Sequence, residues 1–373
     1  MRSVGVEEEL LLVDASSGDP LAVSGAVLAA ADRSAGGRSG AGEPQEHTFE
    51  KELQKEQVEF ATKPVTEMGE LAQEIIRWRA EADRHARAAG ARVAALGTSP
   101  LPVQPSLSPG ERYAWVGEQF GLTAQEQLTC GCHVHVSVES DEEGVAVLDR
   151  IRPWLPVLTA MSANSPFWQG ADSGYGSYRS RVWNRFPSAG PVGVFESADR
   201  YHEQVRAMVD TGVLHDEGMI YFDARLSAAY PTVEIRVADV CLDASGPVLL
   251  AALARGLVET AARAWRAGEP PARISTSLLR LAAWRAGRSG LDGPLLHPRT
   301  MREAAPADAV RALHDHVREA LEDHGDQERV SAGIAELLER GNGARVQREL
   351  LSARGDLAAV VAGCVEITTA SAA

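Results

Sequence analysis

Apolar and polar residues alternate along several stretches of the first two thirds of the chain, and this period predicts β-strands. The stretches lie at 3–13, 49–61, 128–138 and 219–240, with a further short strand expected at 93–97. The stretch 219–240 is interpreted as two strands joined near 228–231. Because neighbouring side chains of a strand point to opposite faces, we expect one apolar face and one face that carries charged groups.

Helical spacing of apolar residues dominates the rear of the chain. Helices are predicted at 66–90, 141–164, 246–267, 275–286, 300–323, 327–340 and 350–369. Thr66 is expected to cap the first helix, and Pro153 and Pro156 are expected to kink the second. Strands in the front and middle, with a mainly helical half from about residue 245, favour an α+β fold with an antiparallel sheet. No repeat divides the chain, so we expect a single domain over residues 1–373.

Two segments show no apolar period. The segment 33–47 is crowded with glycine, and we expect it to be a mobile loop. The segment 165–198 is rich in glycine, serine, arginine and aromatic residues. Long irregular segments of this kind usually have a function, so the second segment is a candidate part of an active site.

Charge and composition narrow the classes of function. The chain has 37 basic and 52 acidic residues, a formal net charge of −15, which disfavours binding to nucleic acid or to an anionic membrane. No apolar run is long enough to span a membrane and no signal peptide is recognised, so a cytoplasmic location is expected. Four cysteines in a chain of this length do not form a disulfide framework, and reduced thiols are predicted.

Four of the predicted strands carry charged or imidazole side chains inside an apolar frame. They contain Glu7-x-Glu9, the group Glu52, Glu56 and Glu59, His133-x-His135 and Glu234-x-Arg236. A spacing of two places both residues of a pair on one face of a strand. If these strands are neighbours in one curved sheet, the side chains converge on one concave surface. Carboxylates with one histidine favour Mg²⁺ or Mn²⁺, and such ions commonly hold nucleotide phosphates.

Each pattern also has a simpler interpretation. An acidic strand can lie in water, paired histidines can belong to a core, and Glu234 with Arg236 can form a cross-strand ion pair. Zinc is an alternative because Cys130 and Cys132 lie nearby. However, thiols at spacing two share one strand face and do not close a tetrahedron with both histidines, so the cysteines are predicted to be small apolar core residues.

Several longer motifs resemble a known family. They are Gly5-Val6-Glu7-Glu8-Glu9, Gly131-Cys132-His133-Val134-His135-Val136, the run Asn164 to Gly170 continuing in Ser177 to Trp183, and Tyr230 to Val240. From residue 3 to about residue 360, the chain resembles the ATP-dependent carboxylate-amine ligases of the glutamate-cysteine ligase type 2 family. The resemblance implies a fold similar to that of glutamine synthetase: a curved, mostly antiparallel sheet that forms a funnel-like active site, with helices packed on its outside.

The resemblance also implies roles for individual residues. The metal ligands it implies are Glu7, Glu9, Glu52, Glu59, His133 and Glu234. His135 and Arg236 are expected to bind ATP, and Arg179, Arg181 and Arg236 to act as catalytic cations. The substrate is expected to contact Arg179, Tyr178 and Trp168.

The activity implied by the resemblance is the formation of an amide through an acyl phosphate. Its cofactor is Mg²⁺ or Mn²⁺, and its small-molecule partners are ATP, an amino acid and an amine. Glutamate is the expected acid, reacting at its γ-carboxylate, and cysteine is the first candidate for the amine. The segments 33–47 and 165–185 are candidates to cover the intermediate. A homodimer is a further expectation. The alternatives are a metal-dependent hydrolase and a nucleotide-binding protein without catalysis.

Overall fold

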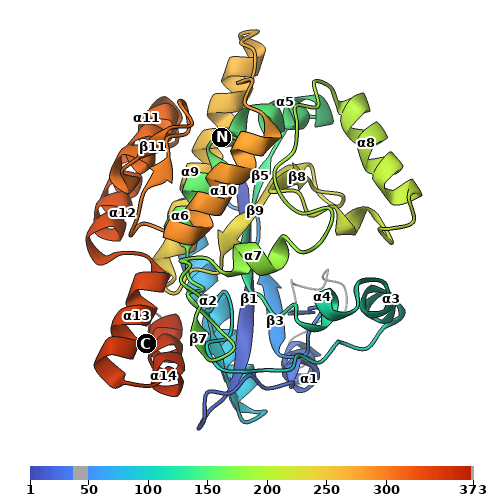
Figure 1. Cartoon of the computed structure of the whole chain (residues 1–373), viewed down its shortest axis with the longest axis vertical. Helices are drawn as coiled ribbons and strands as arrows, with labels where there is room; N and C mark the ends of the chain where they lie inside the picture. Colours follow the sequence, from blue (N-terminus) through green and yellow to red (C-terminus); the bar gives the residue numbers. More distant parts are fainter. Residues whose placement is uncertain (37–48, 371–373) are drawn as a thin grey trace.

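A seven-stranded sheet forms the centre of the protein, as the computed structural model of residues 1–36 and 49–370 describes it (Figure 1). Its strands are β1 (Val4–Asp14), β2 (Glu50–Lys51), β3 (Gln57–Ala61), β4 (Ala91–Ala94), β5 (Gly131–Ser137), β8 (Ala224–Leu226) and β9 (Thr232–Asp239). They follow the order β2-β3-β1-β5-β9-β8, and β4 pairs with the far end of β1. All of these pairings are antiparallel.

Helices surround this sheet (Figure 1). Before residue 245 they are α1 (Ser24–Gly36), α2 (Met68–Arg87), α3 (Glu111–Phe120), α4 (Leu122–Gln125), α5 (Asp141–Ile151), α6 (Leu155–Ser162), α7 (Arg179–Trp183), α8 (Ala198–Asp210) and the 3₁₀ turn η1 (Glu217–Met219). After it come α9 (Ser245–Arg266), α10 (Thr276–Ser289), α11 (Pro306–His324), α12 (Gln327–Arg340), α13 (Gly343–Arg354) and α14 (Leu357–Thr369). The short hairpins are β6 (Phe167–Trp168) with β7 (Ala171–Asp172) and β10 (Leu295–Leu296) with β11 (Glu303–Ala304). The expected α+β class, with a curved, mostly antiparallel sheet and helices packed on its outside, is confirmed.

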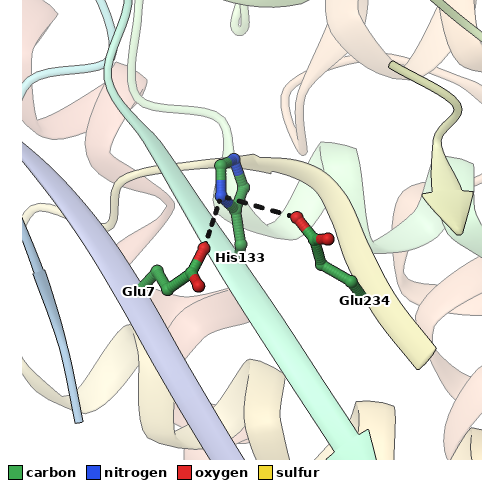
Figure 2. Close-up of side chains that lie close together, drawn as sticks. All are labelled: Glu7, His133 and Glu234. Carbon is green, nitrogen blue, oxygen red and sulfur yellow. Dashed lines mark hydrogen bonds and ion pairs between the residues drawn. The ribbon is translucent and has the colours of Figure 1, made fainter. Parts of the chain in front are cut away.

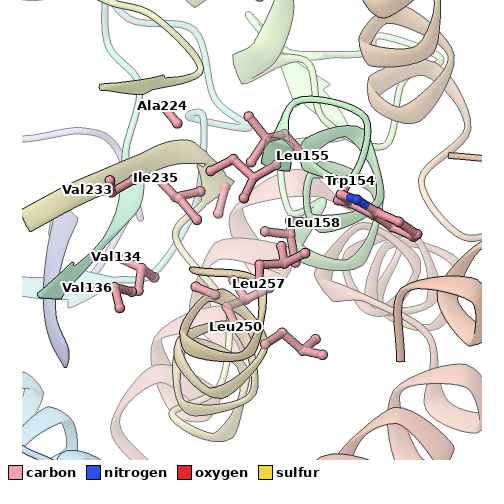
Figure 3. Close-up of a cluster of buried hydrophobic side chains, with 14 of the residues drawn as sticks. Val134, Val136, Trp154, Leu155, Leu158, Ala224, Val233, Ile235, Leu250 and Leu257 are labelled. Carbon is pink, nitrogen blue, oxygen red and sulfur yellow. The ribbon is translucent and has the colours of Figure 1, made fainter. Parts of the chain in front are cut away.

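One face of the sheet is apolar and packs on helices. Figure 3 shows Val134 of β5 and Ile235 of β9 turned toward Leu155 of α6 and Leu250 of α9. Strand alternation explains this arrangement, because the residues between them in sequence point to the other face. A second apolar cluster lies around the far end of β1 and includes β4 and α14. The polar face is therefore left free to form a site.

A buried ion pair interrupts the apolar face. Glu8 lies between Glu7 and Glu9 in sequence and points away from them, toward α2. Its carboxylate accepts two hydrogen bonds from the Arg79 guanidinium, Nε to Oε2 at 2.8 Å and Nη2 to Oε1 at 2.7 Å. Arg79 also donates to the carbonyl oxygens of Leu242 and Cys241. Through four hydrogen bonds from the guanidinium, this pair joins β1, α2 and the segment before α9.

Some predicted boundaries are wrong. The helix predicted at 141–164 is two helices, because Pro153 lies at the break between α5 and α6 and proline cannot donate a helical hydrogen bond. Thr66 does not cap α2, whose N-cap is Glu67 and has no side-chain cap bond. The Thr66 carbonyl accepts a hydrogen bond from Arg255 instead. The strand expected at 93–97 lies at 91–94, and the helix expected from 300 begins at 306.

Other elements were not predicted. The segment 165–198, interpreted as irregular, contains the β6-β7 hairpin, α7 and the first residue of α8. The expected loop at 33–47 begins inside α1, and its remainder lies outside the described residues. Within residues 1–36 and 49–370, no helix combines the length and the apolar character needed to cross a membrane.

Candidate active site

The polar face of the sheet brings the four predicted segments together. The sheet register pairs Glu7 with His133, Glu9 with Glu59, and His135 with Glu234 across neighbouring strands. Strand β1 lies between β3 and β5, and β9 follows β5, so residues that are distant in sequence become neighbours. Their side chains surround a cavity of about 260 Å³.

The first group of possible metal ligands consists of Glu7, His133 and Glu234 (Figure 2). His133 Nδ1 lies 3.2 Å from Glu7 Oε2 and 4.0 Å from Glu234 Oε1. These three side chains come from β1, β5 and β9, and they offer two carboxylates and one imidazole to a common point. Such a set can hold a divalent cation.

The second group consists of Glu9, Glu59 and His133. His133 Nε2 lies 4.0 Å from Glu9 Oε1, so the imidazole stands between the two groups and turns one nitrogen toward each. Glu52 extends the second group, because its charge acts on both Glu59 and Glu9. A neutral imidazole has one free nitrogen lone pair, and His133 can therefore ligate an ion in only one group at a time.

The second group carries charge that no side chain fully balances. Burial and the charge of Glu52 raise the pKa of Glu9 to about 7, and the same two causes hold the pKa of Glu59 well above its usual value. Nε2 of His133 is buried and has no hydrogen-bond partner among the described residues. Crowded carboxylates beside an unpartnered imidazole nitrogen fit a hard divalent cation such as Mg²⁺ or Mn²⁺.

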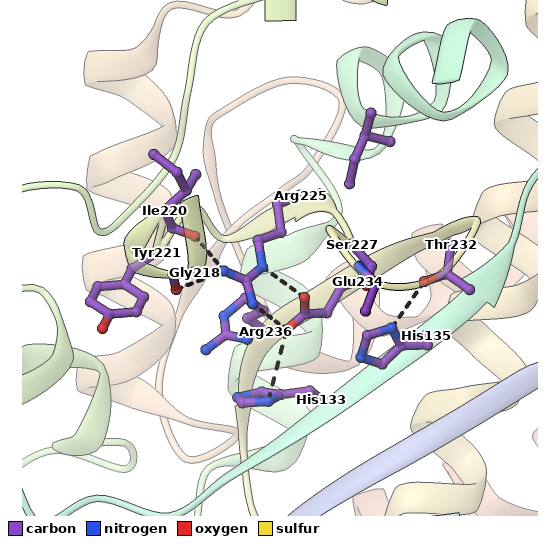
Figure 4. Close-up of polar contacts among 12 residues, drawn as sticks. His133, His135, Gly218, Ile220, Tyr221, Arg225, Ser227, Thr232, Glu234 and Arg236 are labelled. Carbon is purple, nitrogen blue, oxygen red and sulfur yellow. Dashed lines mark hydrogen bonds and ion pairs between the residues drawn. The ribbon is translucent and has the colours of Figure 1, made fainter. Parts of the chain in front are cut away.

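In the first group, two arginines compensate the negative charge of Glu234. Burial opposes ionisation of Glu234, but the charges of Arg236 and Arg225 lower its pKa to about 2. Arg225 Nε donates to Glu234 Oε2 at 2.7 Å, and Arg236 also pairs with Glu234 (Figure 4). Burial, followed by the Arg236 charge, lowers the pKa of His133 to about 4. The imidazole is thus neutral near pH 7, as metal binding requires.

His135 lies two residues after His133 on β5, so its side chain points to the same polar face. Its Nδ1 lies 2.9 Å from the Thr232 hydroxyl (Figure 4). Its Nε2 lies 3.1 Å from Glu7 Oε1. Burial opposes protonation, yet the contact with Glu7 raises the pKa of His135. The pKa values of His133 and His135 are therefore shifted in opposite directions, although the two side chains occupy the same face.

Two buried arginines border the metal groups. Arg179 of α7 is 2% exposed and passes directly over Gly131, where a Cβ atom would lie 2.3 Å from Arg179 Nη2. Arg236 of β9 lies beside it and lines the cavity. The Trp183 ring covers both, with guanidinium carbons 5.7 and 5.8 Å from its centroid. These contacts hold two cations close to the carboxylates.

Asp239 anchors the segment that carries Arg179, a role that the sequence analysis missed. Its buried carboxylate accepts hydrogen bonds from the Ser165 hydroxyl at 2.6 Å and the Ser177 hydroxyl at 2.8 Å. The Ser165 hydroxyl in turn accepts the Arg179 backbone N–H at 2.9 Å. Asp239 thus fixes the start of α7 to the end of β9.

The predicted substrate residues lie apart from the main cavity. Trp168 and Tyr178 pack against each other, with ring centroids 5.6 Å apart, and neither is among the described residues that line the cavity. Glu56 also points elsewhere and accepts the Ser106 backbone N–H. The lining includes Arg112, Tyr113, Tyr221 and Arg225, which the sequence analysis did not select. The local sequence pattern does not reveal which elements lie next to these residues in the fold.

A carboxylate-lined face with buried arginines beside it suits an enzyme that binds a metal ion and a phosphate group. The chain belongs to the Glutamate-cysteine ligase family 2 (GCS2), whose family model matches residues 3–363. It is therefore an ATP-dependent ligase. The two groups of possible ligands on its polar face could hold a divalent metal ion.

Similar sequences cover the whole chain. A provisionally named glutamate-cysteine ligase 2-1 of Streptomyces avermitilis is 62% identical over 368 residues, which are 99% of each chain. A provisionally named glutamate-cysteine ligase 2 of Streptomyces coelicolor is 61% identical over 371 residues and is covered completely.

Solved structures share the fold at low sequence identity. The bifunctional glutathione synthetase of Pasteurella multocida matches all of this chain with a TM-score of 0.69 at 14% identity. The present chain spans about half of that protein, 52% of its length. The glutamate-cysteine ligase of Francisella tularensis, solved in complex with AMP, matches with a TM-score of 0.64 at 13% identity and is 93% covered.

Proposed function

We propose that the chain uses ATP to activate the γ-carboxylate of glutamate and joins the acyl group to an amine, with cysteine as the first candidate. The observation that supports this proposal most is the set of carboxylates around His133 beside two buried arginines. A triphosphate brings several negative charges, and a face with both metal-ligand groups and guanidinium groups suits it. The names of the relatives supply the two candidate substrates.

The proposed cation sites use the two groups of side chains. Glu9, Glu52 and Glu59 would hold one ion, and Glu7 with Glu234 a second, with His133 serving either. Mg²⁺ or Mn²⁺ bound there supplies positive charge that offsets the charge of the triphosphate.

The arginines and histidine have separate proposed roles. Arg179 and Arg236 stabilise the charge of the phosphoryl group as it is transferred, because their guanidinium groups are already held in place by Trp183. His135, at the edge of the face, contacts the nucleotide. Trp183 and the segment 165–185 exclude water from the acyl phosphate, which water would otherwise hydrolyse.

The proposed chemistry proceeds in two steps. An oxygen of the substrate carboxylate attacks the γ-phosphorus, and the bond from that phosphorus to the ADP oxygen breaks. The amine nitrogen then attacks the acyl carbon, phosphate leaves, and the nitrogen loses a proton. The protein contributes positioning and charge stabilisation in both steps and forms no covalent bond to the substrate.

Trapping with hydroxylamine tests the first step without knowledge of the amine. Full-length protein with Mg²⁺, ATP, L-glutamate and hydroxylamine is expected to release ADP and form glutamyl hydroxamate in equal amounts. Replacing hydroxylamine by L-cysteine is then expected to give an amide detected by mass spectrometry. Turnover of a substrate without ATP would point to a hydrolase. Tight ATP binding without ADP release under any of these conditions would contradict the ligase proposal.

A further inference from the structure

A buried glutamine on the C-terminal helix α13 contacts the segment that leads to Arg179. Gln347 is 0% exposed, and its Nε2 donates to the side-chain oxygen of Asn164 at 2.6 Å and to the Asn164 carbonyl oxygen at 2.9 Å. The two residues are 183 positions apart in sequence. Figure 1 shows α7, which carries Arg179, at the centre of the molecule and α13 at its left side. Gln347 is not among the described residues that line the main cavity, so any role in the site must act through other residues.

Asn164 connects Gln347 to the central sheet. Its Nδ2 donates to the carbonyl oxygens of Ala95, directly after β4, and Val240, directly after β9, both at 2.8 Å. Its backbone N–H donates to the Asp239 carboxylate at 2.9 Å. Both N–H groups and the oxygen of the Asn164 amide are therefore engaged, which fixes the direction of this buried side chain.

Ser165, the next residue, connects Asn164 to α7. Its hydroxyl donates to Asp239 and accepts the Arg179 backbone N–H, and its carbonyl accepts the Tyr178 backbone N–H at 3.0 Å. Two hydrogen bonds thus hold the start of α7, and the position of the Arg179 guanidinium depends on them. Arg181 of the same short helix is not among the described residues that line the main cavity, so Arg179 is the arginine that this path serves.

The start of α13 lies in direct contact with residues 163–164. A Cβ atom at Gly343 would overlap the side-chain oxygen of Asn164, so this approach requires glycine. The Ala344 backbone N–H donates to the Ala163 carbonyl at 2.9 Å. These contacts fix the distance between the helix and the segment, and Gln347 adds directional bonds at that distance.

The polar nature of position 347 favours a role in orientation over a role in packing. Oε1 of Gln347 is buried and has no hydrogen-bond partner among the described residues, which costs free energy of folding. An apolar side chain of the same length would fill the space without an unpaired oxygen. It would not fix the direction of Asn164, because only a donor can bond to both Asn164 oxygens.

We propose that Gln347 is a positioning residue of the active site. Acting through Asn164 and Ser165, it holds the start of α7 so that the Arg179 guanidinium lies where the phosphoryl group is transferred. This inference rests on the proposed function, in which Arg179 stabilises that group. None of the site residues assigned from the sequence lies after Arg236, so the inference extends the functional part of the chain to the C-terminal helices.

A double-mutant cycle on ADP release with Mg²⁺, ATP, L-glutamate and hydroxylamine tests the path. Gln347→Met keeps the length of the side chain and removes its donor. It is expected to lower kcat about ten- to a hundredfold with the KM for ATP unchanged, because it misplaces a group that acts in the transition state. Arg179→Ala is expected to lower kcat about a hundredfold or more. The double variant is expected to be no slower than Arg179→Ala, whereas a loss equal to the product of the two single losses would overturn the inference.

Two further variants separate positioning from a general loss of structure. Gln73→Met makes the same chemical change at an exposed position of α2 and is expected to behave like wild type. Ser165→Ala breaks the path beside Arg179 and tests it even where Gln347→Met does not fold; it is expected to lower kcat and to add nothing to Arg179→Ala. Circular dichroism checks the fold of each variant. A folded Gln347→Met or Ser165→Ala protein with the kcat of wild type would overturn the inference.

Hydrogen exchange tests the path without the reaction. Gln347→Met is expected to raise amide exchange over residues 163–183 and to leave residues 141–151 of α5 unchanged, because only the first segment loses its support. If this pattern appears but wild-type protein forms no glutamyl hydroxamate, the link from Gln347 to α7 stands and the ligase proposal fails. If hydroxamate forms but exchange over residues 163–183 is unchanged, the positioning role is overturned and the ligase proposal stands.

Discussion

Glu59→Gln is expected to abolish most ATP-dependent turnover and, at the same time, to stabilise the metal-free protein. Glu59 is a proposed ligand of a metal ion whose positive charge stabilises the transition state, and losing that stabilisation costs about a hundredfold or more in rate. Burial and Glu52 raise the pKa of Glu59, so its ionised form is disfavoured in the folded protein at neutral pH. The neutral amide removes that cost, and we expect a gain of about 1 kcal/mol in the free energy of unfolding without metal.

The expected gain in stability of Glu59→Gln follows from the thermodynamic link between proton binding and folding. A carboxyl group whose pKa is higher in the folded than in the unfolded state lowers stability above its unfolded pKa, and the penalty disappears as the pH falls below that value. Urea unfolding in the presence of a chelator measures the difference, and ADP release measures turnover. Glu349→Gln, an exposed change on α13, is the control and should alter neither quantity. Full activity of Glu59→Gln would contradict its proposed role.

Glu234 provides the opposite case on the same face. Its carboxylate is already compensated by Arg225 and Arg236, which lower its pKa to about 2. Replacing it by glutamine would leave two arginines without their partner, so the stability gain expected for Glu59 does not extend to Glu234. The contrast shows that the carboxylates of this face have different electrostatic surroundings.

Glu8→Ala is expected to be among the most destabilising single changes in the chain, with a loss of about 3–5 kcal/mol in the free energy of unfolding. Glu8 and Arg79 are 0% and 1% exposed, and removing the carboxylate leaves a buried guanidinium charge with only carbonyl partners. The double variant Glu8→Leu with Arg79→Met removes both charges and should recover a large part of the loss. Urea unfolding of the single and double variants measures this coupling. A loss below about 1 kcal/mol for Glu8→Ala would contradict the account.

The sequence predicted much of the polar face because a strand exposes alternate residues. Glu7 with Glu9 and His133 with His135 are local pairs, and their spacing reveals a shared face without knowledge of the fold. Their meeting in space depends on strand order, which no local pattern contains: Glu7 and His133 are 126 residues apart. The resemblance to a family supplied that long-range information.

The missed residues carry no such pattern. Asp239 is a single acidic residue at the end of β9. Its structural role depends on hydrogen bonds from two serines in a distant segment. Arg225 lies on the three-residue strand β8 and becomes important because the register sets it opposite Glu234. Each role arises from tertiary contacts rather than from local sequence.

Anomalous diffraction from crystals soaked with Mn²⁺ and a non-hydrolysable ATP analogue tests the central claim most directly. The account predicts manganese peaks on the polar face, between the triphosphate and the carboxylates of Glu9 and Glu59, with the His133 imidazole adjacent. A triphosphate bound elsewhere, or manganese only at other surfaces, would contradict the claim that these side chains form the catalytic metal site.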